Sequence, residues 1–136
     1  MLMHLSGHQK LVVGGLGSWE ASLGWYICVC SAMRGLTARV AWHTRRRKRM
    51  HWHIDYLGKA CDQALPIAIR GSTRAKCQIT AAPGDLFAPG LAGFGSSDCD
   101  CAAHLFHSLS DPGGLTEFHE LVARVRFSHP LPKQGN

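Results

Sequence analysis

The arrangement of hydrophobic and polar positions predicts a few short strands. An apolar run at residues 24–30 predicts a strand whose successive side chains point to opposite faces. One face would carry Trp25, Ile27 and Val29, and the other Tyr26, Cys28 and Cys30. Apolar stretches at 2–5 and 10–13 predict two strands joined as a hairpin. The stretch 65–69 predicts a short strand that either lies at a sheet edge or has Pro66 as its first residue, because proline has no backbone N–H to donate.

Helical spacing of apolar residues predicts four helices elsewhere in the chain. They are expected at 35–47, 52–57, 73–81 and 115–125, and the third would end before Pro83. The face of the last helix would be formed by Leu115, Phe118, Leu121, Val122 and Val125. This face is expected to pack on the sheet, because a helix with one apolar side needs an apolar surface to cover it.

Length and composition predict one folded domain. The chain has 136 residues, of which 46% are hydrophobic and 18% charged, which excludes the highly charged disordered class. We expect a domain at 1–127 and a flexible tail at 128–136, which has two prolines and no periodic pattern. No leader or stretch of about 20 apolar residues is evident, so the expected location is cytoplasmic, with no membrane partner and with reduced cysteines.

Positive charge is concentrated in one part of the chain. The formal net charge is +6, and no acidic residue occurs between Glu20 and Asp55. That interval contains Arg34, Arg39, Arg45, Arg46, Arg47, Lys48 and Arg49. Such a block attracts polyanions and neutralises phosphates, which favours nucleic acid as a partner. A solvated basic face or a targeting tract would have the same composition.

Two longer motifs are specific enough to compare with known families. The first reads His-Trp-His-Ile-Asp-Tyr-Leu at 51–57, and the second reads Gly-Phe-Gly-Ser-Ser-Asp-Cys-Asp-Cys at 93–101, with His-Leu-Phe at 104–106. Together with residues 24–32 they resemble the Uri-type branch of the GIY-YIG nuclease superfamily, and within it a family of unknown function that carries both motifs. The resemblance implies a small α/β domain of the α+β kind, with a central three-stranded antiparallel sheet flanked by helices.

The resemblance also implies a chemistry, which is metal-dependent hydrolysis of a phosphodiester in nucleic acid, expected to be DNA. In such enzymes Mg²⁺ or Mn²⁺ and an arginine counter charge on the phosphate, while a tyrosine helps to activate water. Arg39 matches the family's arginine, and His43 lies one helical turn further on. Tyr26 is the nearest substitute for the tyrosine, about 7 Å along the strand from the expected position.

The chain departs from the family pattern at other catalytic positions. The first half of the name-giving motif would lie upstream of Leu2, so the first strand is expected to be truncated. Cys28 and Cys30 replace the tyrosine and glycine of the second half, and Lys76 replaces the metal-binding glutamate. An ammonium group repels Mg²⁺, which prefers carboxylate oxygens. Three hypotheses remain open: an endonuclease, a non-catalytic nucleic-acid-binding module, and a truncated reading frame of an active nuclease.

Two further groups of residues are candidate binding sites. The predicted nucleic-acid contacts are Arg34, Arg45, Arg46, Arg47, Lys48, Arg49, His51 and His53. The predicted metal ligands are Cys77, Cys99, Cys101 and His104, with His107 as an alternative. Thiolates and imidazole suit zinc, although a Cys-x-Cys gap is shorter than the usual spacing. Buried reduced cysteines are the other interpretation of the same residues.

Overall fold

The computed structural model describes residues 1–30, 50, 52–67, 69, 75–96, 99 and 101–128. Its strands are β1 (Leu2–Leu5), β2 (Gln9–Val12), β3 (Ser18–Ala21), β4 (Gly24–Cys28), β5 (Gln63–Leu65), β6 (Ala88–Pro89) and β7 (Leu105–Ser108). Its helices are α2 (His53–Ala60), α3 (Ala75–Thr80) and α4 (Thr116–Ser128), with 3₁₀ turns at Gly14–Leu16, Pro83–Asp85 and Pro112–Gly114. The fold is therefore a mixture of helices and antiparallel strands, as expected. The helix predicted at 35–47 lies outside the described residues.

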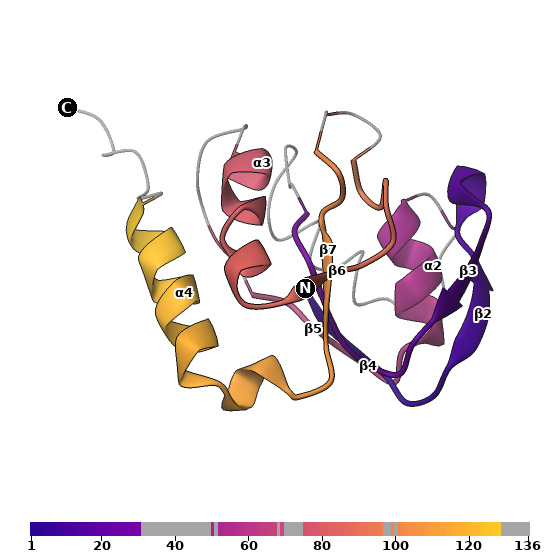
Figure 1. Ribbon diagram of the computed structural model, residues 1–136, viewed down its shortest axis with the longest axis horizontal. Coiled ribbons are helices and arrows are strands. Elements are labelled where there is room, and N and C mark those ends of the chain that lie inside the picture. Colours follow the sequence, from indigo (N-terminus) through magenta and orange to yellow (C-terminus); the bar gives the residue numbers. More distant parts are fainter. Residues whose placement is uncertain are drawn as a thin grey trace.

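The main sheet has five strands in the order β5-β1-β4-β7-β6, and every pairing is antiparallel (Figure 1). The resemblance had implied three strands. The sequence pattern had predicted neither β6, which has only two residues, nor β7, which lies in the second motif (residues 93–106, called the closing motif below). β1, the expected truncated strand, has four residues and is hydrogen-bonded to neighbours on both sides.

The predicted hairpin between the first two strands is wrong. β1 pairs with β4 and β5, whereas β2 pairs with β3 in a separate two-stranded sheet. A local apolar pattern cannot distinguish these pairings, because strand partners are chosen by the tertiary packing of their faces. The edge strand near Pro66 is present but is shifted toward the N-terminus, ending at Leu65, immediately before the proline.

The central strand β4 has two buried faces, as its sequence predicted. Tyr26 and Cys28 belong to a core that also contains Leu57 of α2. Ile27 belongs to the opposite core, with Phe118 of α4. The helices therefore cover both faces of the sheet, with α4 on one side and α2 with the β2-β3 hairpin on the other (Figure 1). Burial on both faces explains why the run at 24–28 is apolar throughout.

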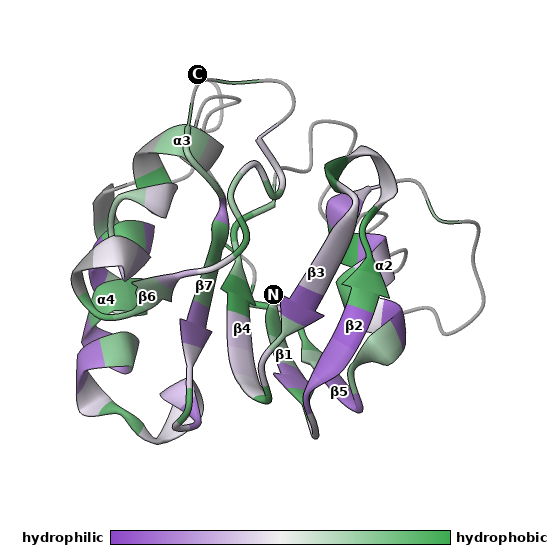
Figure 2. Ribbon diagram, turned by 45° about the vertical axis from the view of Figure 1, so that its right-hand side comes forward, coloured by the Kyte–Doolittle hydropathy of each residue, from purple (hydrophilic) through white to green (hydrophobic). Residues whose placement is uncertain are grey.

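The C-terminal helix packs on the sheet through the predicted face. Phe118, Leu121 and Val125 are buried, and the Phe118 ring lies 6.0 Å from that of Phe87. Both hydrophobic and hydrophilic surfaces are visible on α4 in Figure 2. The helix continues to Ser128, one residue into the predicted tail, and the remainder of that tail lies outside the described residues. No helix in the described part of the chain is long and apolar enough to cross a membrane.

Helix α2 begins at the motif His-Trp-His-Ile-Asp-Tyr-Leu. The Asp55 carboxylate accepts a hydrogen bond of 2.8 Å from the backbone N–H of Trp52, which closes the first turn. Ile54 and Leu57, three residues apart, are both buried against the sheet. The helix predicted at 52–57 is thus confirmed and extends to Ala60. Helix α3 falls within the predicted range 73–81.

Candidate metal centre

Two glycines shape the closing motif around a buried ring. Gly93 and Gly95 have φ angles of +82° and +73°, in the left-handed region that favours glycine, and Phe94 between them is 0% exposed. The backbone N–H of His104 donates to the carbonyl of Phe94 at 2.8 Å, and that of Gly93 donates to Ala102 at 2.7 Å. These bonds hold the turn against the segment that leads into β7.

The two motifs are in direct contact. The backbone N–H of Gly95 donates to Nδ1 of His53 at 2.8 Å, and the His53 ring centroid lies 5.7 Å from that of Phe94. Burial lowers the pKa of His53, so its ring is neutral at pH 7, with Nδ1 as the acceptor. His53 therefore joins the start of α2 to the closing motif and adds no positive charge for the nucleic-acid contact predicted for it.

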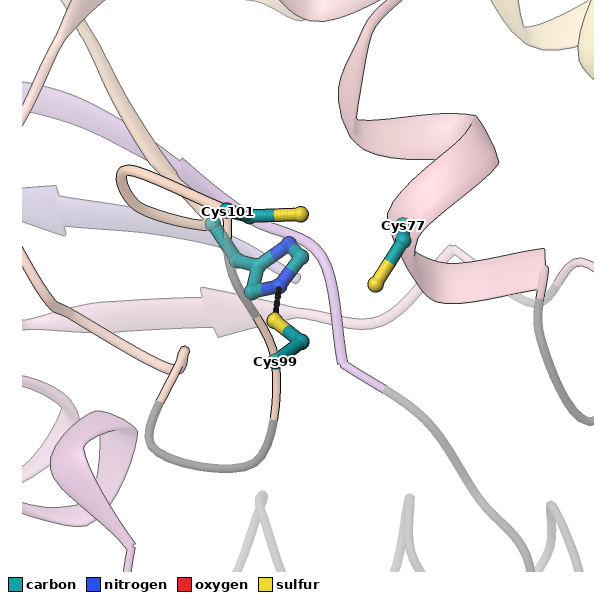
Figure 3. Close-up of side chains that lie close together, drawn as sticks. Cys77, Cys99 and Cys101 are labelled. Carbon is teal, nitrogen blue, oxygen red and sulfur yellow. Dashed lines mark hydrogen bonds between the residues drawn. The ribbon is translucent and has the colours of Figure 1, made fainter.

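The fold brings the four predicted metal ligands together. Cys77 lies on α3, Cys99 and Cys101 lie in the segment before β7, and His104 immediately precedes that strand. One ligand atom from each side chain lies within 4.8 Å of all the others. Figure 3 shows the three cysteine side chains converging from these two elements. The residues form a Cys₃His centre that could hold a metal ion, such as zinc.

Both ring nitrogens of His104 have defined partners. Its Nε2 lies 3.1 Å from Sγ of Cys99, and its Nδ1 is hydrogen-bonded to the hydroxyl of Thr80. Its backbone carbonyl accepts a 2.9 Å hydrogen bond from Val29. Sequence reasoning missed Thr80. The available signal was its position three residues after Cys77, because residues so spaced share a helix face.

The thiols of the centre lie close enough to influence one another. The pKa of Cys101 is raised to about 11, first by a hydrogen bond with Cys77, then by desolvation and by Cys99. Several sulfurs facing each other cannot readily all become thiolates without a counter-charge. A cation among them would reverse that preference, because a coordinated thiol is deprotonated.

The alternative ligand His107 does not join the centre. Its ring lies over Tyr26 at a centroid distance of 4.8 Å, and its Nε2 is 2.9 Å from the carbonyl oxygen of Leu23. It lies on β7 three residues beyond His104 and points to a different part of the sheet. Adjacent strand residues point to opposite faces, so spacing alone could not choose between these two histidines.

Tyr26, the predicted substitute for the catalytic tyrosine, lies in the core. Its hydroxyl donates to the carbonyl of Ser22 at 2.6 Å, and its ring makes an edge contact with Trp19. Burial raises the pKa of Tyr26 to about 12, with a smaller contribution from Cys61. Deprotonation of this phenol is therefore unfavourable, and its hydrogen is already directed to a backbone acceptor.

Most of the remaining predicted site residues lie outside the described part of the chain. The residues outside the described part of the chain are Arg34, Arg39, His43, Arg45, Arg46, Arg47, Lys48, Arg49 and His51. The backbone of Lys76 lies in α3, next to Cys77. The predicted nucleic-acid surface and the roles of Arg39 and His43 accordingly stay predictions.

The fold and the centre define the chain as an α+β domain with a cysteine-rich candidate metal site. The chain belongs to the family described as domain of unknown function DUF123, whose family model matches residues 1–127. The match ends within α4 and covers both motifs and all four candidate ligands. Comparisons with curated proteins and with solved structures gave no match.

Substituting Gly95 by alanine should destabilise the fold by roughly 1–2 kcal/mol, because its φ of +73° is unfavourable for an L-residue. The new Cβ would also lie 3.3 Å from Cβ of His104. Gly58→Ala is the matched control, since Gly58 lies in α2 with nothing within 4 Å of the added Cβ, and it should be stabilising by about 0.5–1 kcal/mol. Urea denaturation measures both changes, and equal effects would contradict the argument.

Acidification should destabilise the contact between the two motifs. Burial lowers the pKa of His53 below its ordinary 6.5, so the folded state binds fewer protons than the unfolded state. The resulting stabilisation is complete above pH 6.5 and is lost as the pH falls through the folded pKa. His53→Asn retains an acceptor for the N–H of Gly95 but does not titrate. The native chain should lose its advantage in unfolding free energy over His53→Asn as the pH falls below 6.5. A difference that stays constant with pH would contradict the lowered pKa of His53.

Proposed function

We propose that the chain is a GIY-YIG-type domain of the Uri branch that binds nucleic acid and whose cleavage chemistry is impaired. The observation that carries the proposal is the contact between the two motifs on which the resemblance rests. They are far apart in the sequence, yet His53 and Gly95 are directly hydrogen-bonded. Motifs that form one structural unit support common ancestry better than two independent matches would.

Cleavage would be impaired because groups that the family uses for catalysis are replaced in this chain. Cys28 stands where the family's tyrosine is expected, and it is buried in the core beside β1. Tyr26 is held by Ser22 and has a raised pKa. Lys76 replaces the carboxylate that would hold Mg²⁺ or Mn²⁺. A bound metal ion supplies several kcal/mol of transition-state stabilisation, and each 1.36 kcal/mol is tenfold in rate.

Binding would be retained because the chain keeps its concentrated positive charge. Seven basic residues occur between Arg34 and Arg49, with no acidic residue among them. Because His53 is neutral, phosphate contacts would come from the arginines and Lys48. Nucleic-acid binding by such a block needs no tyrosine, carboxylate or metal ion. The proposed function therefore survives the replacements that impair cleavage.

The test is to incubate the purified chain with labelled DNA and RNA of duplex, branched and single-stranded form. Mg²⁺ or Mn²⁺ is compared with a chelator, and Arg39→Ala is the control. The expected result is binding that weakens with salt, without cleavage. Metal-dependent cleavage that is lost in Arg39→Ala would instead establish the second candidate function, an active endonuclease. Absence of binding to every substrate would overturn the proposal.

A further inference from the structure

The Cys₃His centre has no part in the proposed binding of nucleic acid, and its donor set favours a particular class of ion. Three sulfurs and one imidazole nitrogen are soft or borderline ligands, which suit zinc and do not suit magnesium. Mg²⁺ prefers oxygen ligands in octahedral geometry, and the centre offers four non-oxygen atoms. The chemistry of the ligands therefore separates this site from the family's magnesium site.

The dimensions of the cluster fit a tetrahedral ion. Zn–S bonds of about 2.3 Å and a Zn–N bond of about 2.0 Å place tetrahedral ligands roughly 3.5–3.8 Å apart. The four ligand atoms lie within 4.8 Å of one another, and the contact between Cys99 and His104 is 3.1 Å. The separations are therefore close to those that a tetrahedral ion requires.

The imidazole is already oriented for ligation. Metal-binding histidines usually hydrogen-bond through the ring nitrogen that does not contact the metal, and Nδ1 of His104 is bonded to Thr80. The Nε2 atom is thereby directed at the sulfurs. The His104 side chain is 0% exposed, and its backbone is hydrogen-bonded on both sides, to Phe94 and Val29. A buried, doubly anchored imidazole reduces the entropy lost when an ion binds.

The cysteines could instead be small buried hydrophobic residues, but that interpretation fits Cys61 better than it fits the cysteines of the centre. Cys61 is 4% exposed and packs among apolar residues, as a filler cysteine should. Cys77 is exposed, and Cys99 and Cys101 are only partly buried. Their sulfurs face one another and an imidazole rather than an apolar core. Packing alone gives no reason for that arrangement.

The centre would also anchor a short helix, few of whose described side chains are buried. Helix α3 has six residues, and a helix of that length is not stable in water by itself. Among the α3 side chains that the structure describes, only Thr80 is buried. Both Thr80 and Cys77 are directed to the centre. An ion held there would join α3 to the segment that precedes β7.

We propose that Cys77, Cys99, Cys101 and His104 bind one Zn²⁺ as a closed structural site. Four protein ligands complete the tetrahedron and leave no position for water or substrate, which distinguishes a structural zinc from a catalytic one. The ion joins α3 to the segment that precedes β7. This position matters for the family's chemistry, because α3 also carries Lys76 where the magnesium ligand is expected. The proposal is independent of nucleic-acid binding.

The experiment measures metal content and affinity in the full chain, purified in reducing buffer. Elemental analysis should find one zinc per chain, and Co²⁺ added to the stripped protein should give the intense absorption of tetrahedral cobalt thiolate. Cys99→Ala should lose both, whereas Cys61→Ala, the control, should retain both. Zinc content well below one per chain after saturation with Zn²⁺, or an unchanged cobalt spectrum in Cys99→Ala, would overturn the proposal.

A second variant covers the case in which Cys99→Ala does not fold. Thr80→Val keeps the size of the side chain and all four ligands but removes the hydroxyl that orients His104. Loss of such a partner typically weakens metal binding 10–100-fold, which competition with a chromogenic chelator measures. Unchanged zinc affinity in Thr80→Val would exclude Nε2 of His104 as a ligand oriented in this way. None of these measurements uses nucleic acid, so their failure is distinct from failure of the proposed function.

Discussion

Replacing all five basic residues at 45–49 by glutamine should abolish most of the salt dependence of DNA binding. Each phosphate neutralised contributes about −0.9 to the slope of log affinity against log salt, so five contacts contribute about −4.5. Between about 50 and 200 mM salt, the native chain should lose roughly 500-fold more affinity than the variant. Fluorescence anisotropy with a labelled duplex over this range measures both slopes.

The control is a set of similar charge changes elsewhere. Lys10, Lys59, Arg124 and Arg126 are exposed on β2, α2 and α4, and replacing these four by glutamine removes nearly as much charge. If the five basic residues at 45–49 contact phosphates directly, the control variant should keep most of the slope of log affinity against log salt. Equal slopes in the two variants would mean that total charge, rather than the block at 45–49, determines binding.

Replacing Phe94 by alanine should destabilise the domain by about 3–5 kcal/mol, which is a large share of the stability of a small protein. The ring is 0% exposed and lies 6.3 Å from that of Trp19 and 5.7 Å from that of His53. Its loss would leave a cavity between the closing motif, the β2-β3 hairpin and α2. Trp19 is held by the pairing of β3 with β2 and cannot easily move into the space.

Urea denaturation measures this change, with Phe127→Ala as the matched control. Phe127 lies near the end of α4 and is 89% exposed, so its truncation should change the free energy of unfolding by less than about 0.5 kcal/mol. A similar loss in both variants would indicate that Phe94 does not anchor the core. A reduced slope of unfolding against urea in Phe94→Ala would indicate a less compact folded state.

Local sequence patterns predicted those parts of the fold that depend on one element at a time. The two faces of β4 follow from alternation, and the buried face of α4 follows from helical spacing. The pairing of strands was harder to predict from the sequence, because β1 pairs with β4 and β5, which lie far from it in the sequence. The closing motif was identified by its resemblance to a family and not by alternation of apolar and polar residues, so its strand β7 was not predicted.

The sequence by itself indicated Cys77, Cys99, Cys101 and His104 as a candidate metal centre, because thiolates and imidazoles are ligands that suit zinc. It also determined the buried faces of β4 and α4, since hydrophobic periodicity follows from local geometry. Only the tertiary structure decided that His104 rather than His107 faces the cysteines, that Thr80 orients it, and that Tyr26 is enclosed in the core. The physical reason is that convergence and burial depend on how separate elements pack, which residue spacing does not encode.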